Sequence, residues 1–325
     1  CVLNLKDLNA EVGLPDDIFG LGLAVADINA DGRPDFFVGH SNRMFLPAKG
    51  DKYVESDELN KTFAWTPWNN EDWPCGAAFG DLNRDGLLDL VLGIHSEKAR
   101  NRVYLNEGIK SGVPKFRDVT AECGLPKELP NKSPHVEIQD FDNDGWPDIY
   151  FSTAWMDKDG SITPVIYRNV GERGGMPKFK PNRQLNSDDK LVYYPAGPSG
   201  DYDNDGRIDL FLINWFRGDY CRLLHNESSP DNHWLRVKVQ GESFNRQGIG
   251  SQVAVYSAGG LGKEKALLGF QELTTGYGYA SGQPAVCHFG LGDAEKVDLE
   301  IRLPNGKTIR REGVSELNQV ITIEE

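Results

Sequence analysis

Four segments of this chain repeat one spacing of oxygen-bearing side chains. Each segment has Asp or Asn at position 3, Asp at positions 1, 5 and 9, and Gly at position 6. A calcium ion takes about six to eight oxygen ligands, and a Gly lets a loop turn sharply around the ion. The carbonyl group at position 7 would add a backbone oxygen, as it does in an EF-hand loop. The spacing therefore predicts four calcium ions, one in each segment.

We number these segments loop 1 (residues 27–35), loop 2 (81–89), loop 3 (140–148) and loop 4 (201–209). The predicted ligands of loops 1 and 2 are Asp27, Asn29, Asp31, Arg33 and Asp35, and Asp81, Asn83, Asp85, Leu87 and Asp89. Those of loops 3 and 4 are Asp140, Asp142, Asp144, Trp146 and Asp148, and Asp201, Asp203, Asp205, Arg207 and Asp209. Turns without metal are the alternative interpretation, because Asp, Asn and Gly are common turn residues.

The net charge favours bound cations. The loops hold 14 Asp side chains and the formal net charge of the chain is −14, which four Ca²⁺ ions would reduce to −6. Without a cation, carboxylates this close would repel one another and some would be protonated. The acidity argues against nucleic acid or an anionic membrane as a partner. No run of 18 apolar residues is present, so no transmembrane helix is expected.

Strand-like runs flank the loops, as Leu23–Ala26 and Phe36–Gly39 do for loop 1. These strands, and the lack of Glu at position 12, exclude an EF-hand. The loops begin 54, 59 and 61 residues apart, and each unit is predicted to have four strands. Four strands in a repeat of this length are typical of a propeller blade. We therefore predict an all-β fold, with a calcium-binding β-propeller of four clear blades in residues 1–230.

The N-terminus offers a way to close the ring of blades. Residues 5–14 align with residues 116–125, which end the second unit. We therefore expect an N-terminal strand to complete the last blade, which would remove an exposed sheet edge. An open arc, or a ring completed by the downstream region or by a second chain, remains an alternative.

No further Asp loop follows loop 4, and a polar linker near residue 230 leads to a different set of predicted strands. Polar and apolar residues alternate in Val297–Leu303, and Pro304–Lys307 has the composition of a hairpin turn. We predict a small β-sandwich in residues 231–325.

Both regions resemble known families. The loops with their flanking strands resemble FG-GAP/VCBS-type repeats, the calcium-binding blades of integrin α-subunit propellers. The tail resembles the ASPIC/UnbV domain of the cartilage acidic protein-like family, through Asn232–Val237, Asn245–Gly250, Gly276–Tyr279 and His288–Gly292. The resemblance implies a secreted or surface protein and implies no reaction. Fuller members of the family have more blades than the four found here.

Four other residues are candidates for chemistry in the propeller channel. The inner strand of the third unit carries His135 and Glu137 where the other units have small residues, and His40 and His95 end the second strands of the first two units. If these side chains converge, they could form a transition-metal site or a catalytic base. The alternative is that the histidines fill turns and gaps. A second hypothesis is that Trp65, Trp68, Trp73, Trp155 and Trp215 form a platform for sugars or peptides, the alternative being core packing.

These observations favour an extracellular binding or adhesion protein that is stabilised by about four Ca²⁺ ions and recognises a protein or glycan. The alternative is a calcium-scaffolded enzyme with its site around His135 and Glu137. Calcium loops of moderate affinity suit a location outside the cytoplasm, whether secreted, periplasmic or at the cell surface. Cys1 is compatible with a lipoprotein anchor and equally with a trimmed end.

Overall fold

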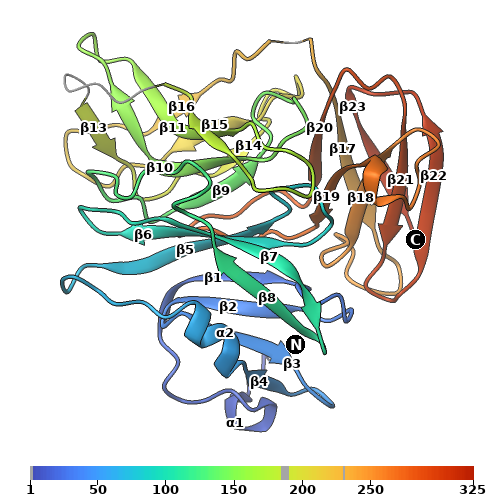
Figure 1. The fold of residues 1–325 in the computed structure, drawn as a ribbon, viewed down its shortest axis with the longest axis horizontal. Helices are drawn as coiled ribbons and strands as arrows, with labels where there is room; N and C mark the ends of the chain where they lie inside the picture. Colours follow the sequence, from blue (N-terminus) through green and yellow to red (C-terminus); the bar gives the residue numbers. More distant parts are fainter. Residues whose placement is uncertain (1–2, 184–189, 230) are drawn as a thin grey trace.

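A computed structural model describes residues 3–183, 190–229 and 231–325 (Figure 1). Cys1, which is compatible with a lipid anchor or a trimmed end, lies outside the described residues. The all-β prediction is confirmed, since helix in the described residues is limited to α1 (Asn9–Val12), α2 (Asp57–Thr62) and one 3-10 turn, η1 (Glu264–Ala266).

The first four sheets follow one another along the chain as blades 1 to 4. Blade 1 contains β1 (Gly20–Ala26), β2 (Asp35–His40), β3 (Arg43–Pro47) and β4 (Tyr53–Glu55), and blade 2 contains β5 (Trp73–Gly80), β6 (Asp89–His95), β7 (Arg102–Lys110) and β8 (Val113–Asp118). Blade 3 contains β9 (Val136–Gln139), β10 (Asp148–Met156), β11 (Ile162–Asn169) and β12 (Phe179–Pro181), with β13 (Lys190–Tyr193) also paired to β10. Blade 4 contains β14 (Ser199–Gly200), β15 (Asp209–Leu212) and β16 (Arg222–Leu224). All these strand pairs are antiparallel.

The inner strands are rich in small residues because neighbouring blades approach closely there. A Cβ atom on Gly22 of blade 1 would lie 1.9 Å from the carbonyl oxygen of Cys75 in blade 2. A Cβ atom on Gly76 of blade 2 would lie 2.4 Å from the carbonyl oxygen of Pro134, just before blade 3. These contacts leave no room for a side chain, so the small residues are needed for packing.

Hydrophobic core clusters join blade 1 to blade 2, blade 2 to blade 3, and blade 3 to blade 4. Within the described part of the chain, no such cluster joins blade 4 to blade 1. Leu21 and Leu23 of β1 remain 44% and 49% exposed. The four blades therefore form an arc whose ends do not share a core.

The predicted N-terminal closing strand is wrong for this structure. Residues 3–8 form no strand, Leu3 and Leu5 are more than 80% exposed, and blade 4 has three strands. The physical reason lies in the turn after this segment. Gly13, at the end of α1, packs under the Tyr53 carbonyl of blade 1, as Gly124 packs under the Phe179 carbonyl of blade 3. This contact holds the N-terminal segment near blade 1, at the opposite end of the arc from β16 (Figure 1).

The second region contains two packed sheets around a core of its own. One sheet contains β17 (His233–Gln240), β20 (Cys287–Gly292) and β23 (Gln319–Glu324), with β17 parallel to β23. The other contains β18 (Gln252–Ser257), β19 (Leu267–Glu272), β21 (Val297–Arg302) and β22 (Thr308–Val314). The predicted boundary at residues 230–231 falls between β16 and β17. This β-sandwich lies beside the arc of blades (Figure 1).

Candidate calcium loops and the channel site

The four Asp loops share one backbone conformation. Position 4 is left-handed in every loop, with φ between 57° and 63° at Ala30, Arg84, Asn143 and Asn204. The Gly at position 6 has φ between 84° and 90° in every loop. The φ near 60° at position 4 lies in the small left-handed region that L-residues can enter. The φ of 84–90° at position 6 lies beyond this region, so position 6 needs Gly. Each loop connects the inner strand of its blade to the second strand.

The carboxylates of positions 1 and 9 hold each loop closed. The position-1 carboxylate accepts a hydrogen bond from the position-6 N–H at 2.7–3.0 Å in all four loops. The position-9 carboxylate accepts from the position-2 N–H at 2.8–3.2 Å. One nine-residue pattern thus gives the same closed turn four times.

Several ligand atoms predicted from the sequence lack a partner within the protein. Asp35 Oδ1, Asn83 Oδ1 and Asp140 Oδ1 are buried and accept no hydrogen bond. In loops 3 and 4 the carboxylates of positions 1, 3 and 9 lie close enough to share one ion, as Asp140, Asp142 and Asp148 do, and as Asp201, Asp203 and Asp209 do. A cation would satisfy buried acceptors of this kind. The residues present therefore fit calcium.

The position-9 carboxylate of loop 1, Asp35, has one hydrogen-bond partner fewer than its equivalents in the other loops. In blades 2, 3 and 4 the position-9 carboxylate accepts a second hydrogen bond at 2.8 Å, from the backbone N–H of Asn106, Asn169 or Asn226. The equivalent residue in blade 1 is Pro47, which has no N–H. Asp35 Oδ1 consequently lacks the backbone partner that its equivalents in the other blades have.

Burial raises the pKa values of the loop carboxyl groups. The pKa of Asp35 rises to about 8 and that of Asp81 to about 7, mainly through desolvation. Burial also raises the pKa values of Asp89, Asp140 and Asp148 well above the ordinary range, and neighbouring carboxylates add to the effect. Near neutral pH Asp35 is therefore largely protonated and Asp81 about half protonated unless a cation keeps them ionised.

This leads to a pH-dependent prediction. A carboxyl group with a raised folded-state pKa binds more protons when folded than when unfolded, so the metal-free protein should lose stability as pH rises from about 4 through about 7 to 8. Calcium binds the ionised form, so its stabilising effect should grow over the same window. Thermal unfolding with calcium and with EGTA should give a larger difference in Tm at about pH 8 than at about pH 5. An equal difference would contradict the account.

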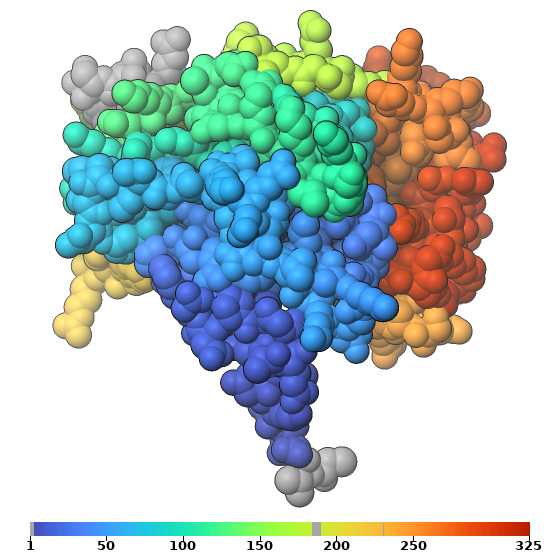
Figure 2. Space-filling model, turned by 60° about the horizontal axis from the view of Figure 1, so that its bottom comes forward, coloured from blue at the N-terminus to red at the C-terminus, as the bar shows by residue number. Residues whose placement is uncertain are grey.

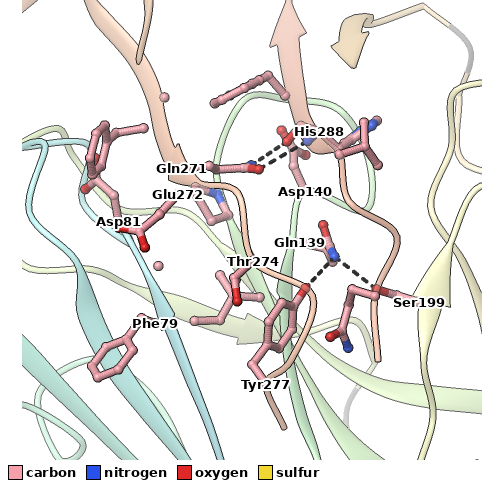
Figure 3. Close-up of a pocket in the computed structure, with 18 of the residues that line it drawn as sticks. Phe79, Asp81, Gln139, Asp140, Ser199, Gln271, Glu272, Thr274, Tyr277 and His288 are labelled. Carbon is pink, nitrogen blue, oxygen red and sulfur yellow. Dashed lines mark hydrogen bonds between the residues drawn. The ribbon is translucent and has the colours of Figure 1, made fainter. Parts of the chain in front are cut away.

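The β-sandwich packs against these loops, a contact that sequence reasoning missed. Glu272 Oε2 accepts from the Asp27 N–H at 2.9 Å, and Arg236 Nη1 donates to Asp201 Oδ2 at 2.9 Å. His288 Nε2 donates to Asn143 Oδ1 at 2.7 Å. Side chains of both regions meet around a cavity of about 90 Å³ (Figure 3). The sandwich therefore contacts the sites where cations are predicted.

The His135–Glu137 pair is formed but is fully buried. His135 Nδ1 accepts from the Tyr279 N–H at 2.9 Å, so Nε2 carries the proton and donates to Glu137 Oε1 at 2.8 Å. Glu137 also accepts from Gln283 Nε2 at 2.6 Å and from Ser199 Oγ at 2.9 Å. Tyr279 and Gln283 belong to the segment between β19 and β20, which enters the channel from the sandwich. We call residues 274–284 the plug.

His40 and His95 do not join this pair. Both imidazoles stack on the indole of Trp73, with ring centroids 5.1 Å and 5.3 Å away. Among the described residues, no group of potential metal ligands contains any of the three histidines. The convergence that a channel site would require is therefore not seen, because an aromatic ring separates two of these histidines and the plug encloses the third.

The tryptophans do not form one platform either. Trp155 is 2% exposed, and Arg100 and Arg102 lie over the Trp65 ring. Trp68 donates to Ser96 Oγ, whereas Trp215 is 60% exposed and contacts Tyr193 and Phe216. Of these five tryptophans, Trp215 alone exposes more than half of its surface to solvent.

Comparison with known families agrees with this geometry. Residues 81–151, which include loops 2 and 3, match the FG-GAP-like repeat model, and residues 241–325 match the ASPIC and UnbV model. The chain thus contains a region similar to FG-GAP-like repeats and a region similar to the ASPIC and UnbV domain. Among the described residues of both regions, no helix is long and apolar enough to cross a bilayer.

Curated relatives match nearly the whole length of this chain. Cartilage acidic protein 1 of Mus musculus is 29% identical, and that of Xenopus tropicalis is 28% identical, each over 99% of this chain. These matches cover 48% and 47% of the two relatives, so the chain spans about half their length. Integrin alpha-5 of Xenopus laevis is 20% identical over 71% of this chain and 22% of its own length.

Proposed function

We propose that this chain is a calcium-stabilised extracellular binding or adhesion module that recognises a protein or glycan partner. The observation that carries the proposal is the set of four closed Asp loops, with buried carboxylate and amide oxygens that lack a protein partner. Four ions would stabilise the loops of the FG-GAP-like region and the face on which the ASPIC and UnbV domain packs. The likeness to an integrin α chain supports the adhesion class.

The residues that would hold the ions are those predicted as ligands in loops 1 to 4. Side-chain oxygens at positions 1, 3, 5 and 9 and the carbonyl oxygen of position 7 would bind Ca²⁺, which neutralises their charge. Calcium sites of extracellular modules bind in the range of about 10⁻⁴ to 10⁻³ M, which suits a location outside the cytoplasm.

An exposed aromatic group on blade 4 is the best candidate for the recognition surface. Trp215 is 60%, Phe216 49% and Tyr220 74% exposed, in the segment between β15 and β16. Figure 2 shows this yellow part of the chain projecting from the surface at the left. Exposed Trp and Tyr side chains are enriched among residues that dominate binding energy, and their ring faces also pack on sugars.

The burial of His135 and Glu137 supports binding over catalysis. A catalytic base must come within hydrogen-bond distance of its substrate, whereas both side chains here are 0% exposed and covered by the plug.

The test is a solid-phase binding assay against panels of extracellular-matrix proteins and glycans, in millimolar calcium and in EGTA. We expect at least one saturable, calcium-dependent partner, whose binding weakens tenfold or more in a Trp215→Ala/Tyr220→Ala variant. Trp68→Ala is the matched control, because Trp68 is also an exposed tryptophan, at 47%, but lies on blade 2. An equal loss of binding in the control would exclude the blade 4 surface as the recognition site. The absence of any partner on either panel would contradict the proposed function.

A further inference from the structure

Loop 4 differs from the other three loops in having an imidazole beside it. His225 follows β16 directly, and the strand register makes Leu46, Leu105 and Arg168 its equivalents in blades 1, 2 and 3. Because leucine occupies this place in two blades, the fold does not require a histidine there. The residue is therefore a candidate for a role specific to blade 4.

The imidazole faces three carboxylates of the loop. His225 Nδ1 lies 3.3 Å from Asp209 Oδ1 and 3.6 Å from Asp203 Oδ2, and Nε2 lies 4.0 Å from Asp205 Oδ2. Nitrogen and oxygen ligands that bind one ion at about 2.0–2.2 Å lie roughly 3 Å apart. The observed separations of 3.3–4.0 Å are somewhat longer, so small side-chain movements would bring one imidazole nitrogen and the carboxylates to ligand distances.

Loop 4 and His225 provide two sets of potential ligands that share Asp203. Asp201, Asp203 and Asp209 form an all-oxygen set, and Asp203, Asp205 and His225 form a second set with one nitrogen ligand. Asp205 of the second set is also a predicted calcium ligand, so the carboxylates of Asp203 and Asp205 would lie between the two ions. In each set, one atom from every residue lies within 4.8 Å of the others. Calcium prefers the first set, because it takes oxygen ligands, whereas imidazole favours transition metals such as zinc.

The residues of the second set are open to solvent, and neighbouring side chains contact two of them. The His225 side chain is 35% exposed and lines a groove between blades 3 and 4, so an ion can reach it. The Tyr202 ring packs edge-on against the imidazole with centroids 5.9 Å apart. Arg207 pairs with Asp205 and would have to release one carboxylate oxygen when an ion binds.

We propose that loop 4 binds a divalent transition-metal ion of the zinc or manganese class through His225, Asp203 and Asp205, next to its calcium position. The inference requires the carboxylates of loop 4 but not the adhesion function, so either can fail without the other. A plain ion pair between a protonated His225 and the loop is the competing explanation.

The experiment is a Zn²⁺ titration of the calcium-saturated chain by isothermal calorimetry. Wild-type protein should bind one more zinc equivalent than His225→Leu, or bind it at least tenfold more tightly. His225→Leu reproduces the residue of blades 1 and 2, and an unchanged Tm in calcium would show that it folds.

His233→Ala controls for non-specific binding, because it removes another histidine outside loop 4 and should leave the zinc count unchanged. Repeating the titration with Mn²⁺ identifies the preferred metal. Equal zinc binding by wild type and His225→Leu, or no zinc binding by wild type, would overturn the proposal and support the ion pair.

Discussion

Removing calcium should destabilise this chain more than any single substitution. An ion that binds only the folded state at about 100 times its Kd stabilises it by about 2.7 kcal/mol, so four independent sites would contribute about 11 kcal/mol. Domains of ordinary stability unfold with about 5–15 kcal/mol. We therefore expect EGTA to lower Tm sharply or to unfold the chain at ambient temperature, as measured by circular dichroism with increasing calcium.

Two controls make this result specific to the loops. Magnesium at equal concentration should restore little stability, because Mg²⁺ demands a stricter octahedral geometry than these loops offer. Asp140→Asn should weaken the calcium response, because Asp140 is a buried position-1 carboxylate, whereas Asp159→Asn should not, because Asp159 lies outside the loops. A Tm that is identical in calcium and in EGTA would refute the prediction that loops 1 to 4 bind calcium and stabilise the fold.

Glu137→Ala should be the most damaging substitution in the channel. Glu137 is 0% exposed and accepts hydrogen bonds from His135, Ser199 and Gln283, which come from blade 3, blade 4 and the plug. Its removal leaves three buried donors unpaired, and breaking such a network typically costs about 3–5 kcal/mol. We expect a corresponding loss in the free energy of unfolding, measured by urea denaturation in calcium.

The same variant distinguishes a structural role from a catalytic one. Glu137→Gln keeps an acceptor oxygen of the same shape and should lose less stability than Glu137→Ala, and Glu316→Ala, a change on an exposed loop, should lose almost none. Hydrogen exchange of residues 274–284 should accelerate in Glu137→Ala, because the plug loses a contact in the channel. Unchanged stability and exchange in Glu137→Ala would instead favour a site poised for chemistry.

The Asp loops could be predicted from the sequence because their geometry is local. The two hydrogen bonds that close loop 2, for example, lie between residues 81 and 89, so a nine-residue pattern contains the turn. The sandwich was predicted on similar grounds, from the alternation in Val297–Leu303. Strand alternation and turn composition act over a few residues, which is the range that a single sequence reports well.

Contacts between distant segments could not be predicted in this way. Glu272 reaches Asp27 across 245 positions, and Tyr279 reaches His135 across 144. The N-terminal strand was expected from a correct alignment of the turn at Gly13 and Gly124, but packing of that turn on blade 1 decides where the preceding residues lie. His225 differs from its equivalents in the other blades, which are Leu or Arg, and such a difference can be read from the sequence once the repeats are aligned.

The most direct test of the central claim is a count of calcium ions on the folded chain. Native mass spectrometry after exchange into millimolar calcium should show four bound ions, and substitution of Asp35, Asp89, Asp148 or Asp209 by Ala should each remove one. A chain that carries no calcium while it remains folded, or a count that these substitutions leave unchanged, would contradict the account.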